Sequence, residues 1–292
     1  MYDRLRGGLY GVAVGDALGG TTEFMRPADI RSAHGYLTEI AGGGVWRLEP
    51  GEVTDDTMMT LCVAEGILER PDDPMEAIGS RFLAWYSTRP KDVGNTIRQA
   101  LEAFEGDWFD AAILTDRSLG QSGGNGTLMR CLPIALGYAK LADIEKLSRM
   151  QSRMTHYDGR CDEACIIYNR IAARLLTGED RTDAVRMEVA GTAYEDVMDG
   201  EPPACEPTGF VVDTMRLALH HFLASHEFAE VVQRAANGGG DSDTIGAIAG
   251  GLAGIYWGYE GIPARYAEAI LVREMLDDTA ARLWRLRQGM PS

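Results

Sequence analysis

The sequence predicts an all-α protein, a single compact helical bundle that spans residues 1–292. Apolar side chains recur every three to four residues over most of the chain, which is the spacing of one helix face. Alternation with a period of two is hard to find, and only residues 37–40 and 44–48 could form short extended pieces. No long low-complexity stretch or block of like charge marks a domain boundary. We therefore expect one mostly helical domain.

The first expected helix carries a ridge of glycines, Gly7, Gly11, Gly15 and Gly19. The apolar run 244–258 repeats this pattern with Gly246, Gly250 and Gly254. Residues four apart share one face of a helix, and each glycine costs a helix roughly 1 kcal/mol relative to alanine. Such ridges make sense if they let backbones approach closely, so we expect both helices at the centre of the bundle. Two arrangements remain open: the ridges pack against each other, or each packs against unrelated bulky side chains.

Amphipathic spacing predicts the remaining helices in chain order. A helix follows Thr57, and another contains Ile78, Phe82 and Trp85 after a cap and first-turn proline at residues 73–74. Further helices are expected over residues 161–176, 209–224, 226–236 and 262–287. Polar segments that contain glycine or proline predict loops at residues 41–53, 87–94, 117–126, 155–160 and 198–208.

Composition excludes several classes of partner and compartment. The formal net charge of −16 repels nucleic acid and anionic membranes, so neither is expected as a partner. Five cysteines without a CxxC pair indicate reduced thiols and a cytoplasmic protein. No transmembrane segment is expected, because the run 244–258 is interrupted by glycines and is shorter than the ~20 residues that cross a bilayer.

Two clusters of acidic residues each open an apolar helix. The first cluster is Thr54-Asp55-Asp56, and the second contains Asp241, Asp243 and Thr244. Both could simply cap their helices, since side-chain oxygens there accept hydrogen bonds from free backbone N–H groups. If the two clusters converge, however, four carboxylates repel one another unless cations lie between them. One distance between the clusters distinguishes metal binding from capping.

The ligand types favour hard cations. Carboxylate and hydroxyl oxygens without histidine or cysteine select Mg²⁺ or Mn²⁺ over Zn²⁺. Two such ions ~3.5–4 Å apart can bridge a water molecule or a substrate diol. Glu23, after the first glycine-rich helix, could add a carboxylate, or it could be an ordinary surface acid.

Three further segments carry polar groups that could reach a ligand. Residues 121–130 form a glycine-rich loop before a helix, a setting that suits phosphate, although a flexible turn explains it equally well. His156 lies among polar loop residues and could donate to a phosphate or a ribose hydroxyl; alone, such a histidine is usually solvated. Asp92 either caps the helix that follows it or points into the site, and Asn95 follows in the same loop.

Together these motifs resemble the ADP-ribosylglycohydrolase family over almost the whole chain. The segments that carry the resemblance are GVAVGDALGGTTEFM, PGEVTDDTMM, RPKDVGNT, GGNGTLMRCLP, the TH at 155–156, VVDTM and NGGGDSDTIGAIAGGLAG. The resemblance implies an all-α bundle with a dinuclear metal centre. It implies that the metal ligands are Thr54, Asp55, Asp56, Asp241, Asp243 and Thr244, with Glu23 nearby. It implies substrate contacts from Asn95, Ser122, Gly123, Gly124, Asn125, Gly126, His156 and Phe210.

The chain looks closest to the branch of this family that acts on dinitrogenase reductase. Phe210 stands where that branch has a tyrosine, Gly120 where it has a glutamate, and Asp158 where it has a second histidine. These departures leave the chemistry in place and weaken the assignment of the protein target. The resemblance also implies an ADP-ribosylated protein as substrate and a signalling protein of the PII type as a regulatory partner.

The expected activity is hydrolysis of the N-glycosidic bond between ADP-ribose and a protein arginine. Glycoside cleavage needs a base and an acid, and Asp92 and Glu23 are the candidates, with Asp55 required for turnover through its hold on the metal. The alternatives are another ADP-ribose linkage (serine-linked, O-acetyl-ADP-ribose or an ADP-ribosylated base), a non-catalytic ADP-ribose-binding module, and a metal-free scaffold in which the aspartates only cap helices.

Overall fold

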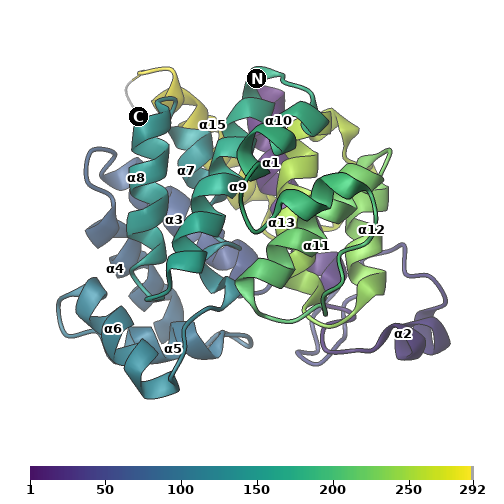
Figure 1. Ribbon diagram of the computed structural model, residues 1–292, viewed down its shortest axis with the longest axis horizontal. Coiled ribbons are helices and arrows are strands. Elements are labelled where there is room, and N and C mark those ends of the chain that lie inside the picture. The colour runs from purple at the N-terminus through teal and green to yellow at the C-terminus, as the bar shows by residue number, and fades with distance from the viewer. Residues whose placement is uncertain (291–292) are drawn as a thin grey trace.

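The computed structural model describes residues 1–290, which fold into helices and connecting loops without a β-strand (Figure 1). This confirms the predicted all-α class. No helix in this part of the chain is both long and apolar enough to cross a membrane. The α-helices are α1 Tyr2–Gly19, α2 Pro27–His34, α3 Asp55–Glu69, α4 Met75–Ser87, α5 Asn95–Glu102, α6 Trp108–Leu119, α7 Leu132–Gly137, α8 Leu141–Ser152, α9 Gly159–Thr177, α10 Arg181–Val189, α11 Val211–Ala224, α12 Phe228–Gly238, α13 Ser242–Trp257, α14 Ala264–Ala269 and α15 Arg273–Arg287. Short 3-10 helices are η1 Asn125–Thr127, η2 Glu195–Asp199 and η3 Tyr259–Gly261.

Helices α1 and α13 pack backbone against backbone through their glycine ridges. A Cβ atom built on Gly11 would lie 2.0 Å from the carbonyl oxygen of Gly250, and one on Gly15 would lie 2.0 Å from that of Gly246. Only hydrogen fits at such a distance, so the glycines permit the approach despite their cost to each helix. The two ridges therefore pack against each other, and the alternative of unrelated bulky partners is wrong.

The α1–α13 pair forms the centre of the bundle, as expected. Nearly every residue of both helices is buried. Helices α9, α11 and α12 pack on α13, while α3, α12 and α15 pack on α1 (Figure 1). Because each ridge fixes one backbone against the other, the C-terminal end of α1 and the N-terminal end of α13 are held together.

The structure contains helices that the spacing did not predict, among them α2, α6 and α10, and it also differs from the prediction at the C-terminal helix and at the two extended pieces. Residues 262–287 form two helices, α14 and α15, because the chain is extended at Ile270 and turns there. At this break Leu271 N–H donates to the Gly51 carbonyl, 3.0 Å away, and Gly51 approaches the Ala269 backbone too closely for a side chain. Neither extended piece is a strand: residues 37–40 pair with no strand, and residues 44–48 form a tight turn closed by a single bridge between Gly43 and Leu48.

Candidate metal centre and active site

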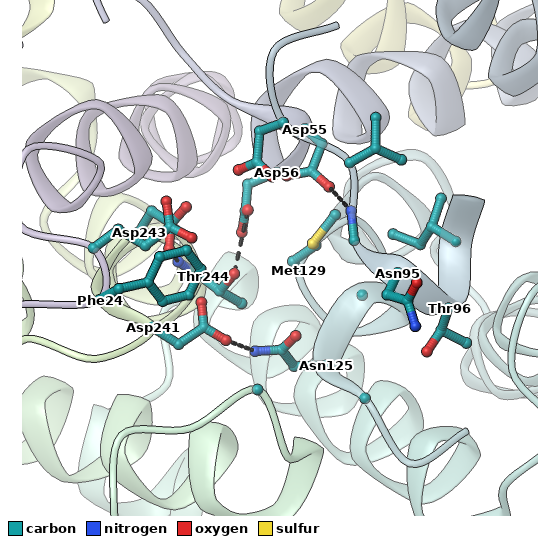
Figure 2. A pocket seen from close by; sticks show the side chains of 18 of the residues that line it. Phe24, Asp55, Asp56, Asn95, Thr96, Asn125, Met129, Asp241, Asp243 and Thr244 are labelled. Atoms are coloured by element: carbon teal, nitrogen blue, oxygen red, sulfur yellow. Dashed lines mark hydrogen bonds between the residues drawn. The ribbon is translucent and has the colours of Figure 1, made fainter. Parts of the chain in front are cut away.

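The N-terminal ends of α3 and α13 face each other across a pocket of about 350 Å³ (Figure 2). The hydroxyl of Thr244 donates to Asp56 Oδ2 at 3.2 Å, although these residues are 188 positions apart in the sequence. Asp55, Asp56, Asp241 and Asp243 all line the pocket. The two acidic clusters therefore converge, which is the arrangement that metal binding requires.

Asp16 on α1 fixes the start of α3. Its buried carboxylate accepts hydrogen bonds from the backbone N–H groups of Thr54 and Thr57 and from the Thr57 hydroxyl. Since α1 is locked to α13 by glycines, Asp16 links that central pair to the first turn of α3. This contact sets where Asp55 and Asp56 stand relative to the second cluster.

Capping accounts for only part of each cluster, and in the second one Asp243 Oδ1 accepts from the Thr244 N–H of the first turn at 2.9 Å. Thr54 caps α3, accepting from Asp56 N–H at 3.4 Å, and its side chain lies outside the pocket lining. Asp241 is the N-cap residue of α13, but its side chain makes no capping hydrogen bond and instead accepts from Asn125 Nδ2 at 2.7 Å. Asp56 Oδ1 is buried and has no hydrogen-bond partner among residues 1–290. A buried, unpaired carboxylate oxygen is costly unless a cation binds it.

Glu23 and Asp92 bring two more carboxylates to the same place. One oxygen each from Glu23, Asp92 and Asp243 lie within 4.8 Å of one another. Glu23 is only 6% exposed and accepts from Trp46 Nε1 at 2.5 Å, so it is not a surface acid. Asp92 does not cap α5, whose N-cap residue is Gly94.

The crowded carboxylates resist ionisation while no cation is bound. Burial, to which the charge of Asp241 adds, raises the pKa of Asp55 to about 6 and that of Glu23 to about 7. Burial and the charge of Asp55 raise the pKa of Asp92 to about 9. Burial and the charge of Asp55 hold the pKa of Asp56 well above the ordinary range, and burial and the charge of Asp56 do the same for Asp243. The ligand atoms are all oxygen, so the site fits hard divalent cations, which would neutralise this repulsion.

A glycine-rich loop and a buried histidine form another wall of the pocket. Gly124, Asn125, Gly126 and His156 line it. A Cβ atom on Gly124 would lie 3.2 Å from His156 Nε2, so the missing side chain gives the imidazole access to the loop. Burial, followed by the charge of Arg130, lowers the pKa of His156 to about 3, which keeps the ring neutral. His156 is therefore not the solvated loop residue that its neighbours in sequence suggested.

The rest of the predicted substrate contacts line an adjoining pocket of about 380 Å³. Ser122, Gly123 and Phe210 belong to it, and it shares Asn95 and Gly124 with the first pocket. The Ser122 hydroxyl is already engaged, since it donates to Asp116 Oδ1 at 2.8 Å and accepts from Tyr157 N–H at 3.0 Å. The Arg160 guanidinium lies 4.9 Å from the centre of the Phe210 ring. This loop therefore offers its backbone and an aromatic face rather than the serine side chain.

Sequence reasoning missed several residues that shape the site. The sequence could have indicated Asp16, because it is an acid within an otherwise apolar, glycine-rich helix. Nothing in the sequence singles out Trp46 or Arg130. Phe24 also lines the pocket, exposed and with φ at +62°. These contacts join segments far apart in the chain, which spacing alone does not reveal.

Comparison with known proteins identifies the family. The family model for ADP-ribosylglycohydrolase matches residues 1–292. The chain is 35% identical to the ADP-ribosyl-[dinitrogen reductase] glycohydrolase of Rhodospirillum rubrum, covering 90% of this chain and 89% of the relative. It is 29% identical to the ADP-ribosylarginine hydrolase Tri1 of Serratia proteamaculans, covering 97% and 79%. A solved structure, an ADP-ribosylglycohydrolase-related protein complex, superposes with a TM-score of 0.85 at 35% identity and 98% coverage of both chains. The chain thus belongs to the ADP-ribosylglycohydrolase family.

Proposed function

We propose that this protein hydrolyses the N-glycosidic bond between ADP-ribose and a protein arginine, with the help of two divalent cations, Mg²⁺ or Mn²⁺. The observation that carries the proposal is the convergence of six buried or half-buried carboxylates, Glu23, Asp55, Asp56, Asp92, Asp241 and Asp243, around one pocket. The two relatives named above, whose names refer to dinitrogen reductase and to ADP-ribosylarginine, support arginine as the linkage.

The residues around the pocket divide into groups with distinct tasks. Asp55, Asp56, Asp241, Asp243 and Thr244 would hold the cations, together with Thr54, whose hydroxyl lies 3.4 Å from Asp56 Oδ2. Bound cations supply positive charge that fixes the vicinal hydroxyls of the distal ribose and lowers the pKa of a water molecule. Asn95, His156 and the backbone of the 123–126 loop would bind the rest of ADP-ribose, with the Phe210 ring at the nucleotide end.

Asp92 is the better candidate for the general base. No described residue donates a hydrogen bond to its carboxylate, whereas Trp46 holds one oxygen of Glu23. In the reaction, the water oxygen bonds to the anomeric carbon as the bond from that carbon to the guanidine nitrogen breaks. The water gives up one proton to a carboxylate, and the leaving guanidine takes one up.

The metal-ligand role is tested by Asp55→Ala. We expect the variant to lose turnover and to bind Mn²⁺ more weakly by calorimetry, while circular dichroism keeps the helical signal. Asp143→Ala is the matched control, since Asp143 also lies in the first turn of a helix, α8, and lines none of the pockets described here. Wild-type rates for Asp55→Ala after metal is stripped and restored would contradict the proposal.

The linkage is tested by comparing arginine-linked and serine-linked substrates. We expect the metal-loaded enzyme to release ADP-ribose from ADP-ribosylarginine and not from ADP-ribosylserine. Faster release from serine would favour another ADP-ribose linkage, and binding of ADP-ribose without turnover would favour a non-catalytic module.

The general-base role is tested by Asp92→Asn. This variant should lower kcat on the order of 10²–10⁴-fold, the usual contribution of a general base.

Finer assignments belong to the same proposal. We take residues 1–292 as one domain, ADP-ribosylated dinitrogenase reductase as a candidate substrate, and a PII-type protein as a candidate regulator. The cytoplasmic location expected from the five unpaired cysteines also remains part of it.

A further inference from the structure

A second groove, of about 560 Å³, adjoins the active-site pocket. Trp46 and Val93 line both hollows, so they form the wall between them. The groove is also lined by three cationic residues, Arg89, Lys91 and Arg98. We call this hollow the basic groove.

The basic groove has positive charge that the protein does not neutralise. Arg89 and Arg98 form no ion pair with any residue in the range 1–290, and Arg98 donates only to the Asn95 side chain, at 2.7 Å. Lys91 is paired with Glu52 at 2.7 Å. The chain has 44 acidic and 28 basic residues, yet none of its described carboxylates pairs with Arg89 or Arg98. The groove therefore suits an anionic group from another molecule.

Arg89 also keeps a strained backbone. Its φ is +58°, a region that side chains other than glycine, asparagine and aspartate adopt at a cost. The other non-glycine residues with positive φ among the described ones are Phe24, which lines the active-site pocket, and Arg47, which follows Trp46. All three lie on loops. Glycine at position 89 would relieve the strain, so the presence of arginine there indicates that its side chain serves a function that offsets the energetic cost of the strained backbone.

The position of the groove identifies which part of a substrate would reach it. The pocket assigned to the nucleotide end, lined by Ser122 and Phe210, shares no residue with the basic groove. If ADP-ribose extends from the carboxylates toward Phe210, the leaving arginine and its own polypeptide extend elsewhere. The basic groove then faces the protein side of the cleaved bond.

We propose that the basic groove binds acidic side chains that neighbour the modified arginine in the protein substrate. This inference rests on the proposed function, because it concerns the polypeptide that carries the arginine. Arg89 and Arg98 would pair with carboxylates of that segment, and guanidinium groups bind carboxylates through two parallel hydrogen bonds. The enzyme would thereby prefer arginines in an acidic context.

The test uses the metal-loaded enzyme and three arginine-linked substrates: ADP-ribosylated free arginine, and ADP-ribosylated peptides flanked either by aspartates or by serines. We expect the wild type to have a lower KM for the aspartate-flanked peptide than for the serine-flanked one. The preference should shrink as ionic strength rises, because salt screens exposed charges. Arg89→Gly/Arg98→Ala should raise the KM for the aspartate peptide roughly 2- to 20-fold, the range for two exposed ion pairs. It should change the KM for free ADP-ribosylarginine much less, because the only link from these arginines to the ADP-ribose site is the hydrogen bond from Arg98 to the Asn95 side chain.

Two single variants serve as controls. Arg47→Gly removes the same charge and the same kind of backbone strain at a residue that does not line the groove. Lys146→Ala removes one charge from an exposed residue of α8 that lines none of the pockets described here. Both should keep the peptide preference. Arg89→Gly alone should unfold at the same or a higher temperature than the wild type while losing part of the preference, a combination that a purely structural arginine does not give.

A binding measurement keeps this test separate from the proposed function. The unmodified aspartate peptide, labelled with a fluorophore, should bind the wild type more tightly than the double variant by fluorescence anisotropy. Equal affinity overturns the groove proposal even if arginine-linked substrates are hydrolysed. If the wild type binds the peptide preferentially but releases no ADP-ribose from arginine, the proposed function fails and the groove remains. Equal loss of free ADP-ribosylarginine in the double variant would assign the groove to ADP-ribose and overturn the inference.

Discussion

His156 presents one ring nitrogen to the pocket because the other is already bound. Its Nδ1 lies 2.8 Å from the Thr155 hydroxyl, which also accepts a hydrogen bond from Arg130 Nη2 at 2.8 Å. Arginine can only donate, so the hydroxyl hydrogen is free to point at Nδ1, and no other acceptor lies within reach of it among the described residues. Nδ1 then carries no proton, and Nε2–H faces the glycine loop as a donor.

This hydrogen bonding predicts the tautomer of His156. In nitrogen-15 NMR of the Mg²⁺-loaded protein, we expect Nε2 to be protonated and Nδ1 unprotonated, with the resonances assigned by their loss in His156→Gln. Thr155→Val keeps the shape of the side chain but removes the hydroxyl, so the preference for the Nε2–H form should weaken and KM should rise. Thr155→Ser should restore both. A proton on Nδ1 in the wild type would contradict this arrangement.

The close contact between helices α1 and α13 leaves no room for a side chain on the glycine ridges. Gly11→Ala would place a methyl group 2.0 Å from the Gly250 carbonyl oxygen, which is backbone and cannot rotate away. We expect the free energy of unfolding to fall by at least about 1–3 kcal/mol, the usual cost of overpacking. Activity should fall as well, because a displaced α1 moves Asp16 and hence α3.

Gly159→Ala provides the control for this prediction. Gly159 is the first residue of α9, and a Cβ atom there would meet nothing within 4 Å. Chemical denaturation should show this variant to be as stable as the wild type, or slightly more stable, because alanine restricts the unfolded chain. If Gly11→Ala proved equally harmless, the close approach of the two backbones would be disproved.

The sequence predicted the helices whose signal lies in their own spacing and failed where distant contacts decide. The ridges of α1 and α13 and the cap at Thr54 followed from residue types at fixed intervals. The convergence of Asp56 with Thr244 was left open by the spacing, and only the family resemblance implied it. The break between α14 and α15 did not, because it depends on Gly51, more than 200 residues away. Asp16 was missed for the same reason: its hydrogen-bond partners lie at the start of α3, and no residue near Asp16 in the sequence indicates which groups it contacts.

Because so many carboxylates lie close together in one site, the stability of the whole protein should depend on pH and on bound cations. In the metal-free form the pKa values of Asp55, Glu23 and Asp92 are raised to about 6, 7 and 9, so the folded chain binds more protons than the unfolded chain between about pH 4 and pH 9. The free energy of unfolding should therefore fall as pH rises through this window. We expect the chelator-treated protein to melt at a lower temperature at pH 8 than at pH 6 in calorimetry.

Cations should remove this trend. Bound Mg²⁺ or Mn²⁺ stabilises the ionised carboxylates and binds the folded chain only, so Tm at pH 8 should rise with metal concentration. Asp92→Asn should flatten the profile of the metal-free protein, since it removes the carboxyl with the highest of the three pKa values. A metal-free protein that grows more stable from pH 6 to pH 8 would show that these carboxylates do not repel one another.

The pairing of α1 with α13 also has a consequence for biosynthesis. The ribosome makes α1 first, yet its glycine ridge has no partner until residues 242–257 have emerged. Asp56 likewise has no partner until Thr244 is made, so a prematurely terminated product that ends before residue 241 lacks Asp241, Asp243 and Thr244. Such a fragment would expose a groove of bare backbone to proteases and chaperones. We expect such a fragment to bind cations more weakly than the whole chain, because carboxylates that line the pocket are missing from it.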